Sequence, residues 1–462
     1  MAMAMSANKL SAYDRLHAFL DMGSVEIIYN ESVVAAKGKV NGRCVYAYAQ
    51  DYSHNAGAMT EEMAEKICDV MDMSLRDMVP LISINESAGA HIQEGVRSLA
   101  GFGRIFRKNM TASGVVPQIS AVLGPCAGGA VYSPALTDFT VMVKDSSYMF
   151  ITGPGVVKAV TGESVTKEEL GGASVHATRS GVAHFAAENE LDALQTIRML
   201  LGYLPSNNLV QAPLCHTYDP SDRCDDSLNV IVPENHRKPY DMYKVIESVV
   251  DDGEFMEVHK RWARNIIVGF AHMGGRSVGI VANQPKILAG VLDSDASRKT
   301  ARFVRFCDAF NIPVVTFADV PGFLCGTQQE YAGVITQGAK LVYAYAEATV
   351  PKITVVLRKS YGGAHVSMGC KELSADVNFA WPSAQIAVMG AESAAEVISS
   401  PHPDFIEDYR SRISNPANAI ANGSLDEIIE PCTTRKRVIE ALSQIADTKP
   451  TGPWKKHDNM PL

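Results

Sequence analysis

Two Gly-Gly-Ala segments, each behind an apolar strand-like run, carry the strongest chemical signal in this chain. Gly128-Gly129-Ala130 follows Pro117 by 11 residues, and Gly362-Gly363-Ala364 follows Pro351 by 11. A turn without bulky side chains lets a ligand reach the backbone N–H groups directly. Such donors stabilise a carbonyl oxygen while it becomes an enolate or an oxyanion. The two segments therefore predict two sites that each bind a carbonyl-bearing ligand.

The two loops belong to a long internal repeat. Gly89 follows Pro80 by 9 residues, and Gly322 follows Pro313 by 9. The offset between the halves is 233 residues at these positions and 234 at the Gly-Gly-Ala loops. Two copies of a long period indicate a duplicated domain and not a solenoid, which has many copies of a short one.

The elements that must position these loops follow from hydrophobic periodicity and capping signals. Thr60, followed by two glutamates, marks the start of a helix that ends near Met78. Strands are expected over 43–50, 80–85 and 117–123, the last two ending in glycine loops that helices follow. This alternation of strands and helices predicts an α/β fold in each half.

A polar stretch separates the two halves. Residues 205–238 hold four of the 22 prolines and little apolar periodicity, which is typical of a linker. We therefore expect one domain over residues 1–220 and a second over residues 221–462.

Composition sets the broad class. The 462 residues are 47% apolar and 20% charged, as in an ordinary globular chain, and the net charge of −9 argues against a nucleic-acid binder. Nine cysteines without a C-x-x-C pair predict reduced thiols. The start, Met1–Asn8, has neither a basic nor an apolar region of a signal peptide, and no run of 18 apolar residues predicts a membrane span. We expect a cytoplasmic enzyme.

Four longer runs resemble one protein family. They cover residues 124–138, 319–331, 344–354 and 375–378. Each is similar to the carboxyltransferase (beta) subunits of biotin-dependent acyl-CoA carboxylases of the propionyl-CoA type. The resemblance extends over residues 9–445. Members of that family have two tandem crotonase-like (ClpP/crotonase) domains, which agrees with the duplication, so we expect that fold here.

The resemblance implies roles for particular residues. As catalytic groups, Gly128 and Gly129 would donate N–H groups to the thioester oxygen of an enolate, and Gly363 and Ala364 would donate to the ureido oxygen of biotin. The biotin nitrogen freed by loss of CO2 would take the α-proton, so no side chain need be the base. The residues expected around the acyl-CoA are Ala130, Ala88, Gly89, His91, Tyr132 and Val366. Those expected around biotin are Gly322, Phe323, Gly362 and His365.

The same resemblance implies cofactors and partners. The chain lacks the Ala-Met-Lys-Met biotin attachment motif. The biotin is therefore expected on a separate carrier, in a biotin carboxylase/biotin carboxyl carrier (alpha) subunit. A CoA thioester is the expected substrate, a homohexamer the expected assembly, and no bound metal, nucleic acid or membrane is expected.

Three alternatives stay open at this stage. The same loops serve the alpha subunit of a biotin-dependent carboxyacyl-CoA decarboxylase. A specialised carboxylase or decarboxylase of a biosynthetic pathway is a second option. A non-catalytic scaffold is a third, although a scaffold has no reason to keep bare Gly128-Gly129 and Gly363-Ala364 loops.

The chain departs from the family pattern at three places. The stretch between the opening helix and the first strand is shorter than in most members. His91 stands where the family has arginine, and His365-Val366 stands where it has Tyr-Asp. An aliphatic Val366 in the expected acyl pocket suggests a different or broader acyl preference. The two histidines either tune ligand binding or are substitutions in the surroundings of the site.

Several polar residues near the loops have structural explanations as well as functional ones. Asp138 and Asp376 are expected to brace loops rather than to react, and Cys126 is expected to be packing. For Glu94 and Glu330 the sequence favours neither bracing nor ligand contact. The basic run Arg97, Arg104, Arg107 and Lys108 is expected on a solvated helix face, with contact to CoA phosphates as the less favoured interpretation.

Overall fold

The computed structural model describes residues 9–398, 402–445 and 453–461. Met1–Asn8, for which we expect no signal peptide, lies outside the described residues. The chain divides into two compact units, Met1–Gln211 and Ala212–Leu462. This division falls inside the polar stretch 205–238, and the finer boundary at 220/221 stays a prediction.

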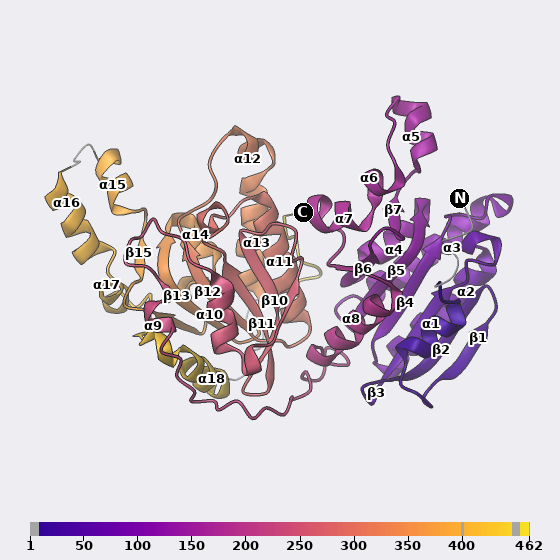
Figure 1. Cartoon of the computed structure of the whole chain (residues 1–462), viewed down its shortest axis with the longest axis horizontal. Helices are drawn as coiled ribbons and strands as arrows, with labels where there is room; N and C mark the ends of the chain where they lie inside the picture. Colours follow the sequence, from indigo (N-terminus) through magenta and orange to yellow (C-terminus); the bar gives the residue numbers. More distant parts are fainter. Residues whose placement is uncertain (1–8, 399–401, 446–452, 462) are drawn as a thin grey trace. The chain divides into compact units, whose positions relative to one another are not determined.

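Unit 1 is built on one mixed sheet. Its strands are β1 (Glu26–Asn30), β2 (Val33–Val40), β3 (Arg43–Gln50), β4 (Leu81–Ser87), β5 (Gln118–Ala127), β6 (Phe139–Val143), β7 (Tyr148–Phe150) and β8 (Phe185–Ala187). Their order is β1-β2-β3-β4-β5-β6-β8, and β7 pairs with β5 (Figure 1). The first three strands are antiparallel and the others pair in parallel, so connections through helices join β3 to β4 and β4 to β5.

The helices of unit 1 cover both faces of this sheet. They are α1 (Ala12–Phe19), α2 (Glu61–Asp77), α3 (Val96–Ala112), α4 (Tyr132–Leu136), α5 (Pro154–Thr161), α6 (Lys167–Gly171), α7 (Ala173–Val175) and α8 (Glu190–Tyr203). Short 3-10 or π turns are η1 (Asn55–Gly57), η2 (Ile92–Glu94), η3 (Gly128–Val131) and η4 (His176–Ser180). One face packs against α2 and α3 through a buried apolar cluster that includes Tyr48, Ile67 and Phe102. Helices α1 and α8 contact each other and the strands from the other side.

Unit 2 repeats the plan. Its strands are β9 (Phe255–Val258), β10 (Ile266–Met273), β11 (Arg276–Asn283), β12 (Val314–Val320), β13 (Lys352–Tyr361), β14 (Val377–Ala380), β15 (Gln385–Ala387) and β16 (Glu427–Ile428). The order β9-β10-β11-β12-β13-β14-β16, with β15 on β13, is the order of unit 1 strand for strand. The duplication predicted from the spacing of glycines and prolines is confirmed.

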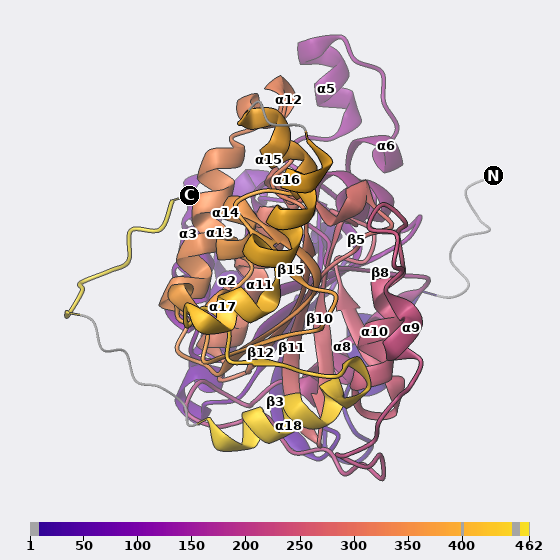
Figure 2. The same cartoon turned by 90° about the vertical axis from the view of Figure 1, so that its left-hand side faces the viewer.

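Helices also flank and connect the strands of unit 2. They are α9 (Leu228–Ile231), α10 (Met242–Val249), α11 (Ser294–Ala309), α12 (Thr327–Tyr331), α13 (Val334–Glu347), α14 (Gly362–Ser367), α15 (Ala391–Val397), α16 (Pro403–Asp408), α17 (Pro416–Ala421) and α18 (Thr434–Gln444). The short turns are η5 (Asp251–Gly253), η6 (Leu288–Gly290), η7 (Lys371–Leu373), η8 (Tyr409–Ile413) and η9 (Pro431–Thr433). Figure 2 shows helices α10 and α18. Both contribute to one core cluster, through Val245 of α10 and Val438 and Leu442 of α18.

The repeat reaches individual backbone angles. Asn41-Gly42 between β2 and β3 and Gly274-Gly275 between β10 and β11 all have positive φ, as a tight hairpin turn requires. The left-handed residues Asn55 and Leu288, 233 apart, open the matching turns η1 and η6. The two units therefore adopt the same backbone at equivalent turns, even where the residue types differ.

The predicted strands and helices are present, but β4 and β5 both end later than expected; β4 ends at Ser87 and not at residue 85. Thr60 caps α2, its side chain accepting the Met63 N–H at 3.1 Å, and β3 spans Arg43–Gln50 as expected. Strand β5, however, continues past residue 123 to Ala127. Its second half leaves β6 and pairs with β7, at Pro125↔Tyr148 and Ala127↔Phe150. A partner strand this far along the chain gives no local signal in the sequence.

Candidate active site

The two glycine loops of unit 1 lie side by side because their strands do. Parallel strands β4 and β5 pair as far as Ser87↔Cys126, so the loops after them leave the sheet together. A Cβ placed on Gly89 would lie 3.0 Å from the Ala127 carbonyl oxygen and 4.0 Å from the Gly128 Cα. The backbones touch with no room for a side chain on Gly89.

The Gly128 loop begins a helical segment. Gly128 has φ +61° and opens η3, which continues into α4. The first N–H groups of a helical segment have no intrahelical acceptor and carry its positive end. A Cβ on Gly129 would lie 3.0 Å from the Phe102 ring, so a side chain there would have to displace a core aromatic. The loop is therefore bare and also packed tightly from behind.

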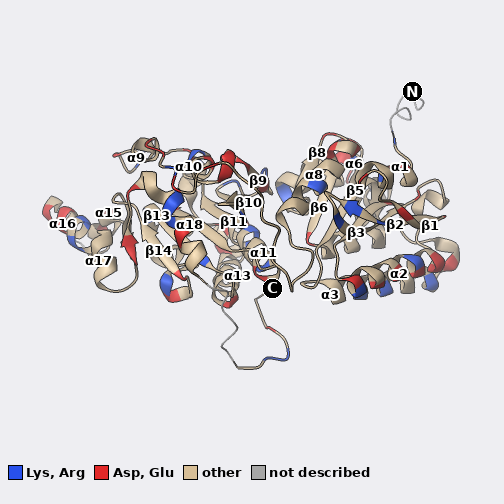
Figure 3. Ribbon diagram, turned by 90° about the horizontal axis from the view of Figure 1, so that it is seen from below, with Lys and Arg blue, Asp and Glu red and all other residues tan. Residues whose placement is uncertain are grey.

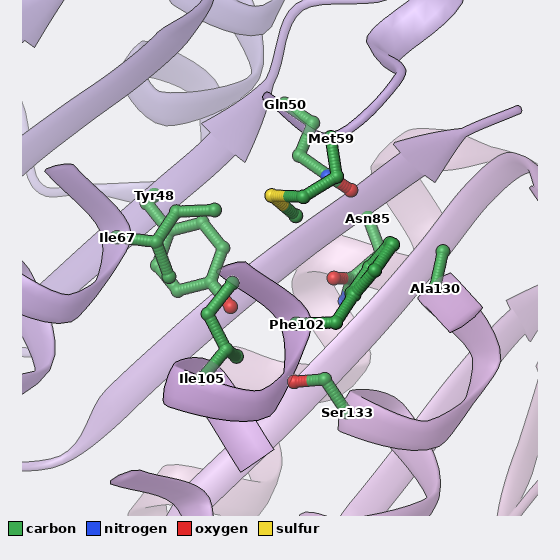
Figure 4. A pocket seen from close by; sticks show the side chains of 9 residues that line it. All are labelled: Tyr48, Gln50, Met59, Ile67, Asn85, Phe102, Ile105, Ala130 and Ser133. Atoms are coloured by element: carbon green, nitrogen blue, oxygen red, sulfur yellow. The ribbon is translucent and has the colours of Figure 1, made fainter. Parts of the chain in front are cut away.

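A small cavity lies behind this loop (Figure 4). It is lined by Tyr48, Gln50, Met59, Ile67, Asn85, Phe102, Ile105, Ala130 and Ser133. Burial raises the pKa of Tyr48 to about 12, so its phenol stays neutral. The Asn85 amide donates to the Ser83 hydroxyl at 3.0 Å. The other lining residues are apolar, amide or hydroxyl side chains, so the lining carries no charged group. The wall behind Ala130 is therefore neutral.

The other expected residues of unit 1 gather at the same edge of the sheet. Ala88 is exposed beside the buried Gly89. The backbone N–H of His91 donates to the Ser98 hydroxyl at 3.1 Å. No described residue forms a hydrogen bond with the buried Nδ1 of the His91 ring. Tyr132 is 46% exposed and packs edge-on against Phe106. His91 thus offers an unused ring nitrogen next to the glycine loops.

Unit 2 repeats this geometry with a more open loop. Strands β12 and β13 pair as far as Val320↔Ser360, and Gly362 opens α14 at φ +57°. A Cβ on Gly363 would meet only the Phe323 ring, at 3.9 Å, and otherwise open space. Because Gly363 is exposed and Phe323 adjoins it, a flat ring can approach these N–H groups without a clash.

The residues that follow are held by α14. Ala364 is fully buried, whereas Val366 is 38% exposed. His365 Nδ1 lies 2.8 Å from the Ser360 hydroxyl, and burial lowers the pKa of His365. The imidazole is therefore neutral at pH 7 and fixed on the strand that leads into the loop.

Buried ion pairs hold the strand ends below the loops. In unit 1, Arg15 donates to Glu86 at 2.8 Å and to Glu190 at 2.7 Å, with Glu86 fully buried. At the equivalent position of unit 2, Asp319 accepts from Arg358 at 2.9 Å and from the Lys359 N–H at 3.0 Å. We assigned no role to Glu86 or Asp319 from the sequence. Their signal is an acid at the same repeat position, at the end of an apolar strand.

The candidate carboxylates Asp138 and Asp376 have bracing roles. Asp138 accepts the Gln118 N–H and Asp376 accepts the Lys352 N–H, both at 2.8 Å. Each therefore holds the start of the strand that leads to a glycine loop, as the sequence favoured. Burial raises the pKa of Cys126 to about 12, which fits its expected packing role.

Glu94 and two cations of the basic run on α3 also have structural contacts. Glu94 accepts the Glu61 N–H at 2.7 Å and braces the start of α2. Arg104 and Lys108 pair with acids of α2, where both signs of charge alternate along the helix (Figure 3). A solvated helix face explains these two cations. For Glu330, no hydrogen bond or ion pair of the carboxylate within the described residues decides between bracing and ligand contact.

Comparison with known proteins agrees with this geometry. The family described as "Carboxyl transferase domain" matches residues 12–460. The propionyl-CoA carboxylase beta chain of Roseobacter denitrificans is 52% identical over 98% of this chain and 94% of its own length. The methylmalonyl-CoA decarboxylase subunit alpha of Veillonella parvula is 54% identical over 94% of this chain and 86% of its own.

A solved structure matches over the same extent. A transcarboxylase 12S crystal structure, described as a hexamer with hydrolysed methylmalonyl-coenzyme A bound, superposes with a TM-score of 0.96. It is 45% identical and covers 98% of this chain and 93% of that one. The expected pair of tandem crotonase-like domains is thereby confirmed. The chain belongs to the carboxyl transferase family and is a carboxyltransferase enzyme of the propionyl-CoA carboxylase beta type.

Proposed function

We propose that this chain transfers a carboxyl group between carboxybiotin on a separate carrier and the α-carbon of an acyl-CoA. The observation that supports this most directly is the pair of bare glycine loops at equivalent helix starts, Gly128-Gly129 and Gly363-Ala364. Two carbonyl compounds react in this chemistry, and each needs a set of donors for a developing negative charge.

In unit 1 we assign the thioester oxygen to the N–H groups of Gly128 and Gly129. The tight packing of Phe102 behind Gly129 holds these donors in place before the substrate arrives. Preorganised donors stabilise an enolate more than its ground-state carbonyl, and removing one typically slows such a reaction by about 10²–10³. The residues that we place around the acyl-CoA are Ala130, Ala88, Gly89, His91 and Tyr132.

In unit 2 we assign the biotin ureido oxygen to the N–H groups of Gly363 and Ala364. Bound biotin would supply the activated carboxyl group. The open space over Gly363 and the Phe323 ring beside it fit a flat bicyclic ring. Gly322, Gly362 and His365 complete the proposed biotin site, and the neutral His365 imidazole adds no charge that would compete with the loop donors.

Val366 bears on the choice of acyl group. It is aliphatic and partly exposed on α14, so it offers an apolar contact where an acidic side chain would repel a hydrocarbon. We therefore propose a broader acyl preference that includes longer chains. The two histidines, His91 and His365, are proposed to tune ligand binding, with a purely structural role as the alternative.

The partners follow from the same assignment. We propose a biotin carboxylase/biotin carboxyl carrier (alpha) subunit as the partner and a homohexamer as the assembly, in line with the hexamer described for transcarboxylase 12S. None of the described helices is long and apolar enough to cross a membrane. A cytoplasmic location stays a prediction, supported by nine cysteines that are all free thiols.

A biotin-dependent decarboxylase alpha subunit is the second candidate, because the Veillonella parvula relative is as similar as the carboxylase chains. One assay tests both. The purified chain is mixed with free biotin and malonyl-, methylmalonyl- or longer carboxyacyl-CoAs, and loss of the carboxyacyl-CoA is measured. Biotin-dependent turnover confirms carboxyl transfer and reports the acyl preference. Turnover without biotin contradicts the proposal.

The direction of net flux needs a second measurement. The chain is expressed with its neighbouring genes, and the complex is assayed for ATP-dependent acyl-CoA carboxylation. ATP-dependent product identifies the carboxylase. Decarboxylation that requires a membrane fraction and sodium identifies the decarboxylase.

A further inference from the structure

Three metal-ligating side chains of unit 2 converge outside the proposed active site. The Cys224 and Cys432 sulfurs and an Asp226 carboxylate oxygen all lie within 4.8 Å of one another. A second such group among the described residues, formed by His365, Cys370 and Glu372, includes His365 of the proposed biotin site. The first group has no part in the carboxyl transfer.

Backbone contacts hold the two cysteine-bearing segments together, although more than 200 residues separate them in the sequence. The Asp225 N–H donates to the Cys432 carbonyl at 3.3 Å. The Cys432 N–H donates to the Asn229 side-chain oxygen at 3.1 Å. Leu228, between them, is buried in the core cluster. The ligand positions are therefore fixed by the fold and do not depend on a bound ion.

Nearby cations are already engaged elsewhere. Arg223 binds the Asp219 carboxylate at 2.6 Å, and Arg435 binds Asp251 at 2.7 Å. Neither arginine pairs with the Asp226 carboxylate. The group is also open to solvent, since Cys224 and Asp226 are exposed. An ion from solution can reach a site that keeps its negative charge.

We propose that Cys224, Cys432 and Asp226 bind one thiophilic divalent cation of the Zn²⁺ class. Two thiolates and a carboxylate suit such an ion, with water in the fourth tetrahedral position. Zn–S bonds of about 2.3 Å place two tetrahedral sulfurs about 3.8 Å apart. The three ligand atoms, all within 4.8 Å of one another, are already close to this separation. The proposal departs from our expectation that the chain binds no metal.

The ion would fasten the segment before α10 to the turn η9 before α18. Both helices pack on the same core cluster, so the link would stabilise unit 2. The neighbouring Cys432 thiol raises the pKa of Cys224 to about 11. The Cys224 thiol is therefore protonated at pH 7 without metal, and a Cys–S–metal bond forms there as the thiol proton leaves to solvent.

Cobalt titration of the full-length chain tests the proposal. The chain is reduced, freed of metal with a chelator and titrated with Co²⁺, which gives a thiolate charge-transfer absorption when sulfur binds it. We expect saturation at one equivalent, displacement by Zn²⁺, and a Tm that rises with Zn²⁺. Cys224→Ser and Cys432→Ser should each weaken Co²⁺ binding at least tenfold. Cys215→Ser, an exposed cysteine outside the group, should bind as the wild type does.

Two results would overturn the proposal. Absence of the thiolate absorption in a folded, reduced wild-type chain excludes a metal site. A Cys224–Cys432 disulfide in peptide mapping of unreduced protein, without bound metal, identifies a redox pair instead. Because the assay reads cobalt binding and not turnover, it stays independent of the carboxyl-transfer proposal.

Discussion

Gly363→Ala separates loop chemistry from loop structure. The new methyl group would meet only the Phe323 ring at 3.9 Å, an ordinary contact, and Gly363 does not have positive φ. Alanine at a helical position is favoured over glycine by about 1 kcal/mol, so the free energy of unfolding should not fall. The methyl group would instead occupy the space through which a ligand oxygen reaches the N–H groups.

The variant keeps the Gly363 N–H, but the methyl group would block a ligand's access to it, so the expected magnitude is that of losing one oxyanion donor. Such a loss raises the barrier by about 2.7–4 kcal/mol, or about 10²–10³ in rate. We expect the kcat/KM of biotin-dependent carboxyacyl-CoA turnover to fall by this factor, with an unchanged or slightly raised Tm. Turnover is followed with free biotin, and Tm is measured by calorimetry on the same preparation.

Two matched glycines serve as controls. Gly362→Ala places a Cβ 3.0 Å from the Val388 carbonyl oxygen at φ +57°, so it should cost about 1–2 kcal/mol of stability. Gly202→Ala, in α8 with nothing within 4 Å, should leave kcat/KM unchanged and leave Tm unchanged or slightly raised. If Gly363→Ala keeps wild-type kcat/KM, no ligand oxygen approaches this loop, and the proposed biotin site is wrong.

Three further predictions concern the framework of the site. Arg15→Leu should destabilise unit 1 by about 1–3 kcal/mol in urea unfolding, because the fully buried Glu86 loses its guanidinium partner while the Lys9 ammonium stays paired with it; a change below 1 kcal/mol would refute a structural role for this pair. Asp138→Ala and Asp376→Ala should each lower the free energy of unfolding by about 1–3 kcal/mol, since a strand N–H loses its acceptor, while turnover at saturation stays within a few-fold; a loss of 10³ in kcat would instead make that aspartate catalytic. Burial lowers the pKa of His365 below its unfolded value of about 6.5, so protonation favours the unfolded chain: its contribution to stability is complete above pH 6.5 and is lost as the pH falls through the folded pKa. His365→Asn should therefore reduce the fall in Tm between pH 7 and pH 5, and an unchanged pH profile would contradict this assignment.

The repeat shows how far local sequence reaches. Caps need only neighbours in the chain, so Thr60 predicted the start of a helix. The extension of β5 to Ala127 could not be predicted, because it depends on pairing with β7 beyond an intervening strand.

The same limit applies to the candidate site. The Gly-Gly-Ala motifs identify both loops, since bare backbone is a property of residue type. The pairing of Arg15 with Glu86 and Glu190 gives no such signal. These two acids lie 71 and 175 residues from Arg15, and only the folded sheet brings them together. Cys224 and Cys432 meet for the same reason.

The sequence by itself thus determined the duplication, the α/β class, the family and the two glycine loops, all of which depend on residue type and spacing along the chain. Only the tertiary structure decided that Gly129 is packed from behind by Phe102 whereas Gly363 is open, and that Asp138 and Asp376 brace strands. It also brought Cys224, Asp226 and Cys432 together. The physical reason is that contacts between distant residues follow from the packing of strands and helices, which no local pattern encodes.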